Sequence, residues 1–195
     1  MNDRSSEKKV LWVLGEPGVG KTTLVRELTK GQTFSFVENP KWTLAEGIAL
    51  AGHYKGGTFD GADTVPYNGV EAALQYWDAN LRGAYSLTLL DGDRFSHDSA
   101  RQFFSERASA YAVLLSAPEE LVAARRKERG SNQSATWIAG RKTKSARFFE
   151  GFADSRSLKL DASLSSEEIA ARVGDLLQNG SGVSESDNPL AWFGS

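Results

Sequence analysis

The chain of 195 residues contains no cysteine and only two histidines. Without cysteine, neither a disulfide framework nor a thiolate metal site can form, which is compatible with a reducing cytoplasm. The histidines, His53 and His97, stand at unrelated positions and make no metal site of their own. Long apolar runs are also missing, since residues 10–14 are far too few for a signal-peptide core or a membrane span. We therefore expect a cytoplasmic protein without a membrane partner.

Two further absences concern function and architecture. No DxxG motif follows a predicted strand and no [NT]KxD motif is found, which argues against a GTPase switch. The chain also shows no internal repeat. Its apolar content of 40% and charged content of 25% are those of an ordinary globular protein, and its length fits one compact domain. We assign that domain to residues 1–179. Two interpretations of the segment 180–195 are equally open. It is either a flexible tail or a segment that docks on the body or on a second subunit, as in a homodimer.

Residues 15–22 fit the phosphate-binding pattern GxxxxGK[ST] and directly follow an apolar run. Glycines let consecutive backbone N–H groups converge on phosphate oxygens, and the following helix offers its positive N-terminal end. Lys21 would reach the β- and γ-phosphates, and the Thr22 hydroxyl would ligate Mg²⁺. A glycine-rich turn before an ordinary helix is the plainer alternative. The pattern predicts an ATP and Mg²⁺ site made by Gly15, Glu16, Pro17, Gly18, Val19, Gly20, Lys21, Thr22 and Thr23.

Apolar strands alternate with helical segments along the whole chain. This pattern predicts a three-layer α/β/α fold of the P-loop NTPase type, with a five-stranded parallel sheet and a helical lid. Strands are expected near residues 9–14, 33–37, 85–91, 110–115 and 157–160. Helices are expected near residues 20–30, 43–52, 68–82, 97–108, 117–129, 134–150 and 165–178.

The segment 53–68 is too irregular for a long strand or helix. A loop of this length inside a compact domain is usually functional, so we interpret it as the acceptor loop. Its acids, Asp60 and Asp63, and its aromatics, Tyr54, Phe59 and Tyr67, are candidate acceptor contacts. Without charge neutralisation, acids would repel a phosphate-bearing acceptor, which favours a neutral hydroxyl or a base edge.

Two carboxylates and an arginine follow the most apolar predicted strand, in the order Asp91-Gly92-Asp93-Arg94. Parallel α/β proteins bind their ligands at the carboxyl ends of the strands. Asp91 is placed to hold Mg²⁺, whereas Asp93 and Arg94 could receive the acceptor's proton and hold the acceptor. Which of the two acids is the base stays open, and a simple polar turn is the alternative.

The formal charge of −2 hides a strong asymmetry. Eight basic residues and one acid lie between Arg125 and Arg147, which makes that segment +7 and the rest of the chain −9. Such a run usually marks a solvated helix face. Beside a phosphate loop, it is better interpreted as a lid, residues 125–148, that holds a polyanion. On a helix over 134–150, one face would carry Trp137, Arg141, Lys144 and Phe148. Trp137 would lie either in the core or against a base.

Several segments together resemble nucleotide kinases of the thymidylate-kinase type. They are the phosphate loop, the Asp93-Arg94-Phe95 turn, residues 114–130, and residues 158–163 with the helix after them. The resemblance covers most of residues 9–178. In that family the turn positions the acceptor, and a mobile lid brings arginines onto the transferring phosphoryl group. The resemblance implies the lid role for some of Arg125, Arg129, Arg141 and Lys144.

The region after the second predicted strand departs from thymidylate kinases proper, because Glu38-Asn39-Pro40 and the loop 53–68 replace their acceptor arginine and aromatics. That loop and residues 137–144 look more like small bacteriophage-encoded kinases, some of which phosphorylate 5-hydroxymethyluracil within DNA. The resemblance implies an ATP-dependent kinase in a host cytoplasm with a nucleotide or DNA acceptor. Expected acceptor contacts are Glu38, Tyr54, Asp60, Asp63, Arg94 and Lys144. The alternatives are a thymidylate-like kinase, a small-metabolite kinase and a nucleic-acid-binding ATPase.

Overall fold

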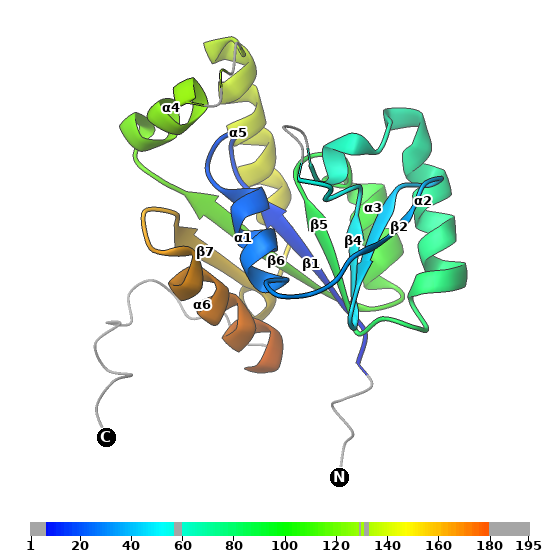
Figure 1. Ribbon diagram of the computed structural model, residues 1–195. Helices are drawn as coiled ribbons and strands as arrows, with labels where there is room; N and C mark the ends of the chain where they lie inside the picture. Colours follow the sequence, from blue (N-terminus) through cyan, green and yellow to red (C-terminus); the bar gives the residue numbers. More distant parts are fainter. Residues whose placement is uncertain (1–6, 57–59, 129, 131–132, 180–195) are drawn as a thin grey trace, which may run out of the picture.

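The computed structural model describes residues 7–56, 60–128, 130 and 133–179. The predictions for Phe59, for Arg129 and for the tail 180–195 lie outside these residues. The described chain forms a mixed α/β fold in which one seven-stranded sheet is flanked by helices (Figure 1). Its strands are β1 (Lys9–Leu14), β2 (Ser35–Val37), β3 (Trp42–Ala45), β4 (Ile48–Ala51), β5 (Leu87–Asp91), β6 (Ser109–Ser116) and β7 (Ser157–Asp161). Its α-helices are α1 (Lys21–Leu28), α2 (Val70–Tyr76), α3 (Asp98–Ser105), α4 (Glu119–Glu128), α5 (Ala135–Phe149) and α6 (Ser166–Asn179).

The sheet is larger than the sequence predicted and is not wholly parallel. Its order is β2-β3-β4-β5-β1-β6-β7, in which β4, β5, β1, β6 and β7 run parallel. β2 and β3 are added antiparallel at one edge. The prediction of a purely parallel five-stranded sheet is therefore wrong in extent, although five parallel strands do form its larger part.

The helix predicted over residues 43–52 is instead the β3–β4 hairpin. Ala45 pairs with Ile48, so only Glu46 and Gly47 turn the chain, and Gly47 has φ +70, which favours glycine. Leu44, Ala45 and Ala49 have good helix propensity, but tertiary pairing with β5 outweighs it. The strand predicted near 33–37 consequently lies at the outer edge as β2, and β4 takes the place beside β5.

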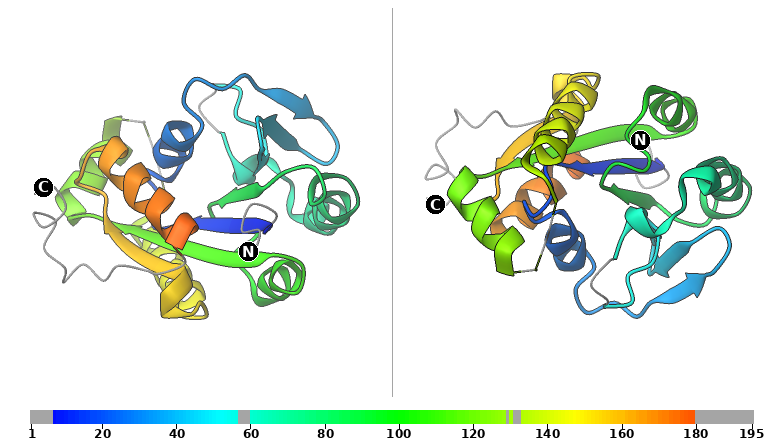
Figure 2. Two further views of the ribbon diagram at one scale, coloured as in Figure 1. Left: turned by 90° about the horizontal axis from the view of Figure 1, so that it is seen from below. Right: turned by 90° about the horizontal axis from the view of Figure 1, so that it is seen from above.

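Strand β1 is buried on both faces, as its continuous apolar run predicts. Val10, Trp12 and Leu14 pack into a core with residues of α2, α3 and α5, where the Trp12 and Phe104 rings meet edge to face at 5.4 Å. The alternate residues of β1 pack into a second core with α1, α4 and α6. The two views of Figure 2 show α1 and α6 on one side of the sheet and α3 and α5 on the other.

Helix α5 changes surroundings along its length. Phe148 near its end is buried against Trp12, whereas Trp137 near its start is 40% exposed. Both residues lie on the helix face that the sequence predicts. Their exposure differs because α4 and the first half of α5 extend past the sheet (Figure 1). The beginning of α5 therefore lies outside the two cores. No helix within the described ranges combines the length and apolar composition needed to cross a membrane.

Candidate active site

The loop between β1 and α1 has the backbone geometry that its glycines predict. Gly15, Gly18 and Gly20 have φ of +140, +87 and +115, a region that side-chain-bearing residues rarely adopt. A Cβ atom on Gly15 would also lie 2.7 Å from the carbonyl oxygen of Leu115. The loop thus keeps its path only with glycine there, and it leads into the N-terminus of α1, where the helix dipole favours an anion.

Lys21 is folded back over this loop. Its Nζ donates hydrogen bonds to the carbonyl oxygens of Gly15 at 2.9 Å and Glu16 at 3.0 Å. Burial lowers the pKa of Lys21, while the carboxylates of Asp91 and Asp93 act in the opposite direction. A low-dielectric position strengthens the attraction of its ammonium for an anion that enters the loop.

Asp91, at the end of β5, is a buried carboxylate beside the phosphate loop. Its Oδ2 accepts a hydrogen bond from Thr22 Oγ1 at 3.2 Å, and its Oδ1 accepts one from the backbone N–H of Ala62 at 2.8 Å. Burial raises the pKa of Asp91. Burial also raises the pKa of the neighbouring Tyr54 hydroxyl, and the negative charge of Asp91 raises that pKa further. The Thr22 and Asp91 oxygens are adjacent, as two neighbouring ligands of Mg²⁺ would be, directly or through water.

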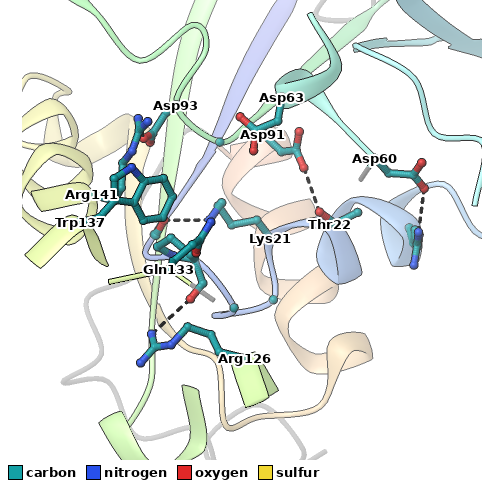
Figure 3. A pocket seen from close by; sticks show the side chains of 16 residues that line it. Lys21, Thr22, Asp60, Asp63, Asp91, Asp93, Arg126, Gln133, Trp137 and Arg141 are labelled. Atoms are coloured by element: carbon teal, nitrogen blue, oxygen red, sulfur yellow. Dashed lines mark hydrogen bonds and ion pairs between the residues drawn. The ribbon is translucent and has the colours of Figure 1, made fainter. Parts of the chain in front are cut away.

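The loop, Asp91 and the turn after it surround a cavity of about 440 Å³. Figure 3 shows Lys21 and Thr22 pointing into the same space as Asp91, with Asp93, Arg141 and Trp137 on one side and Asp60 and Asp63 on the other. Its lining residues are Gly15, Pro17, Gly18, Gly20, Lys21, Thr22, Arg26, Asp60, Asp63, Asp91, Gly92, Asp93, Arg126, Gln133, Trp137 and Arg141.

Where the turn after β5 and helix α5 border this cavity, charged and aromatic groups form one connected set. Asp93 is ion-paired with Arg141, whose Nη2 donates to the Tyr67 hydroxyl at 3.2 Å. The Tyr67 ring in turn stacks on the guanidinium of Arg94, with the centroid 3.6 Å away. Arg141 also lies over the Trp137 ring at 4.8 Å. The turn after β5 and the start of α5 are therefore held together by Asp93 and Arg141.

A second cavity of about 290 Å³ lies on the other side of the phosphate loop. Arg125 from α4 borders it and donates hydrogen bonds to the carbonyl oxygens of Val19 and Ala162, both at 3.1 Å. The rest of its wall is formed by the polar residues Thr23, Glu128 and Ser166 and by Val19, Gly20, Leu24, Leu115, Ala162, Leu164 and Ile169. A cation beside apolar walls is a suitable environment for a planar base, next to a loop suited to its phosphates.

The structure brings together most of the predicted residues and separates others. Thr23 and Arg125 line the second cavity, and Asp60 pairs with Arg26 at 2.7 Å at the rim of the first. Val19 also lines the second cavity. Among the described residues, the predicted ones that line neither of these two cavities are Glu16, Glu38, Tyr54, Tyr67, Arg94 and Lys144. Glu38 is exposed and pairs with Lys55, and Tyr54 is buried in the core. Arg94 lies just outside the lining, where its Nη2 donates to the Asp63 carbonyl at 3.1 Å.

Sequence reasoning missed several residues at this site. Arg26 follows Thr22 by one helical turn, so its position on the loop side of α1 could have been read from the spacing. Gly61 gave no such signal. A Cβ on it would overlap the carboxylate of Asp91, so glycine is what lets the acceptor loop pass this close. Arg126 was not distinguished from Arg125, although only Arg126 lines the first cavity.

Within the described ranges, no group of three or more acidic or histidine side chains could hold a metal on its own. A Mg²⁺ ion here would rely on Thr22 and Asp91, with its other positions filled by phosphate oxygens and water, which is how this ion usually binds. The two oxygens, the adjacent Lys21 and the glycine loop are thus compatible with a Mg²⁺-bound nucleotide.

No family model matches this chain, and no curated protein matches it by sequence. Among solved structures, the fold is similar to that of an unliganded sugar kinase from Janibacter sp. HTCC2649. The TM-score is 0.54 and the sequences are 16% identical, over 88% of this chain and 95% of that one. At this identity the similarity shows the fold alone. The mixed α/β fold of this chain is thus similar to the fold of that sugar kinase.

Proposed function

We propose that this protein is an ATP-dependent kinase that transfers a phosphoryl group to a nucleotide-type acceptor. Our best candidate for the acceptor is the hydroxymethyl group of a modified pyrimidine, 5-hydroxymethyluracil, in phage DNA. One observation carries the proposal: a single cavity of about 440 Å³ is lined by Lys21, Thr22 and Asp91 on one side and by Asp93 and Arg141 on the other. Phosphoryl transfer requires both a donor side and an acceptor side in one cavity.

On the donor side, bound ATP would supply the phosphoryl group and Mg²⁺ would neutralise charge on its phosphates. The loop glycines present backbone N–H groups to anions, and Lys21 offers its ammonium. Thr22 and Asp91 hold their oxygens toward the metal position. Arg125 borders the second cavity, where it would contact the base.

On the acceptor side, Asp93 is the carboxylate we assign to receiving the acceptor's hydroxyl proton. It is ion-paired with Arg141, so the acceptor hydroxyl must replace part of that contact. Arg94 keeps two buried nitrogens, Nε and Nη1, without a hydrogen-bond partner. A buried donor without a partner is costly, so oxygens of an acceptor would satisfy these nitrogens. Because Arg94 lies outside the cavity lining with the Tyr67 ring over its guanidinium, Tyr67 must move before an acceptor reaches them.

Two features of the same face favour a nucleotide-type acceptor. Tyr67 and Trp137, 69% and 40% exposed, both contact Arg141 at the acceptor side and offer ring faces on which a base can stack. Farther along α5, Lys144 and Arg147 line an open groove of about 640 Å³. Within the described ranges neither pairs with a carboxylate, so both are available to the phosphates of a strand.

A second candidate is a kinase of a small hydroxylated metabolite. The solved structure with a similar fold is described as a sugar kinase, and Asp60 and Asp63 line the cavity and could accept hydrogen bonds from hydroxyl groups. A nucleoside monophosphate kinase would meet the same two acids, which repel an acceptor phosphate. We therefore rank a nucleoside monophosphate below a neutral hydroxyl on a base. We also rank the metabolite kinase below it, because the exposed Tyr67 and Trp137 rings favour an acceptor that carries a base.

The test is transfer of label from γ-labelled ATP to a panel of acceptors. The panel contains oligonucleotides with 5-hydroxymethyluracil, matched oligonucleotides with thymine, thymidylate, and sugars. We expect label only in the hydroxymethyluracil oligonucleotide and none with Lys21→Met, which removes the loop ammonium. Label in sugars alone would establish the second candidate. Hydrolysis of ATP without transfer to any acceptor would reject the kinase and leave a nucleic-acid-binding ATPase.

A further inference from the structure

Glu16, the second residue of the phosphate loop, is a buried acid that does not face the cavity. Glu16 is only 3% exposed, and each of its two carboxylate oxygens contacts a cation. Oε2 accepts a hydrogen bond from Arg126 Nη1 of α4 at 3.1 Å, and Oε1 lies 3.1 Å from Lys142 Nζ of α5. Removing a carboxylate from water is costly unless cations compensate it. The charged loop is therefore stable in this form only while both helices lie against it.

Other contacts join the same three elements. The buried Ser145 of α5 donates a hydrogen bond to the carbonyl oxygen of Gly15 at 3.5 Å. Arg126 packs flat on the loop, since a Cβ on Gly18 would lie 2.7 Å from Arg126 Cγ. Among the described residues, Glu16 is the carboxylate that contacts both cations, whereas Glu119 of α4 pairs with Arg126 and not with Lys142.

Helix α5 also carries Arg141, the residue directly before Lys142. Arg141 faces the cavity and pairs with Asp93, whereas Lys142 turns to the phosphate loop. A single helical turn thus joins the donor side of the site to its acceptor side. The contact between Glu16 and Lys142 sets where that turn lies relative to the loop.

We infer that Glu16 is a positioning residue, which ties α5 to the phosphate loop and so places Arg141 for phosphoryl transfer. This inference rests on the proposed kinase function. Glu16 also places a negative charge beside the loop, and Lys142 partly neutralises it. Removing the acid and removing the lysine should therefore have the same effect on the position of Arg141 but opposite effects on the binding of phosphates.

Steady-state kinetics separate these two effects. In Glu16→Gln and in Lys142→Met, we expect kcat to fall at least tenfold. The KM for ATP should stay the same or fall in Glu16→Gln, because a negative charge is lost, and rise several-fold in Lys142→Met. A merely disrupted loop would raise KM in both. In the double variant kcat should be no lower than in the worse single variant, and KM should return toward the wild-type value.

Glu119→Gln is the matched control. Glu119 also pairs with Arg126, at 2.6 Å, and loses the same charge, but it is exposed and does not contact the loop. Its kcat and KM should stay within twofold of the wild type, and Lys142→Arg should restore most of the kcat lost in Lys142→Met. A kcat within twofold of wild type in Glu16→Gln, or losses that multiply in the double variant, would overturn the inference.

An independent readout keeps the inference separate from the proposed function. If the wild type phosphorylates no acceptor, the proposed function fails. The effect of the Glu16–Lys142 contact on α5 can still be measured by amide hydrogen exchange. Residues 135–142 should exchange faster in Glu16→Gln and in Lys142→Met, and at the wild-type rate in Glu119→Gln. Equal exchange in the wild type and these three variants would show that the Glu16–Lys142 contact does not hold α5, and it would overturn the inference.

Discussion

Thr22 Oγ1 donates a hydrogen bond to Asp91 Oδ2 at 3.2 Å and so joins two residues 69 positions apart in the sequence. The contact follows from the sheet, because β1 and β5 are parallel neighbours in which Val13 pairs with Asp91. The phosphate loop leaves the end of β1 and the acid ends β5, so both reach the same edge of the sheet. This relationship turns a loop motif and a polar turn into one site.

Replacing Lys21 by Met should abolish phosphoryl transfer without unfolding the protein. The change removes the ammonium that faces incoming phosphates, and the loss of one such electrostatic contact costs about 100- to 1000-fold in rate. Burial lowers the pKa of Lys21, so the ammonium is disfavoured in the folded state. The melting temperature of the nucleotide-free variant should therefore be at least that of the wild type. Near-normal turnover in this variant would mean that the loop is not the donor site.

Asp91→Asn should stabilise the nucleotide-free protein in a pH-dependent way. Burial raises the pKa of Asp91, so the folded state favours the protonated form. The stabilisation that protonation of Asp91 gives to the folded state is fully present below the unfolded pKa of about 3.9, and it is lost as pH rises through the folded pKa. The advantage of the Asn variant should thus be small in acid and grow toward neutral pH, as measured by urea unfolding. A pH-independent difference, or a less stable variant at pH 7, would contradict it.

Gly61→Ala should destabilise the fold by about 2–4 kcal/mol. Gly61 has φ +93 and ψ −163, a region open essentially to glycine, and a Cβ there would overlap the carboxylate of Asp91. Gly140→Ala is the control, because Gly140 lies inside α5 with no atom within 4 Å of its added Cβ. That change should stabilise the protein by about 0.5–1 kcal/mol. The two free energies of unfolding should therefore shift in opposite directions.

Alanine at Tyr67 or Trp137 should weaken binding of the acceptor but not of ATP. If a base stacks on these rings, the acceptor KM should rise about 5- to 100-fold for each, since base stacking contributes roughly 1–3 kcal/mol. Phe36→Ala provides a control, because Phe36 is an exposed aromatic on the edge strand β2 whose ring lies beside His53 and Lys55, whereas Tyr67 and Trp137 contact Arg141. Initial rates at varied acceptor concentration measure the effect. Equal KM values in all variants would exclude stacking on either ring.

Much of this fold could be predicted because its signals are local. The glycine spacing of residues 15–22 predicted the loop, and the apolar runs predicted β1, β5, β6 and β7 close to their observed limits. The β3–β4 hairpin could not be predicted in the same way. Its residues favour a helix locally, and they form strands because β4 pairs with β5, about 40 positions away along the chain.

The sequence by itself determined the phosphate loop, because only glycines can adopt the backbone angles at positions such as Gly15. It also determined that acids and an arginine follow the strand that ends at Asp91. Only the tertiary structure decided which basic residues meet which acids. Arg141 faces Asp93 while Lys142 pairs with Glu16, since adjacent residues on a helix point in different directions and α5 lies between the loop and the turn. The positive charge that Arg141 and Lys142 share could not distinguish their partners.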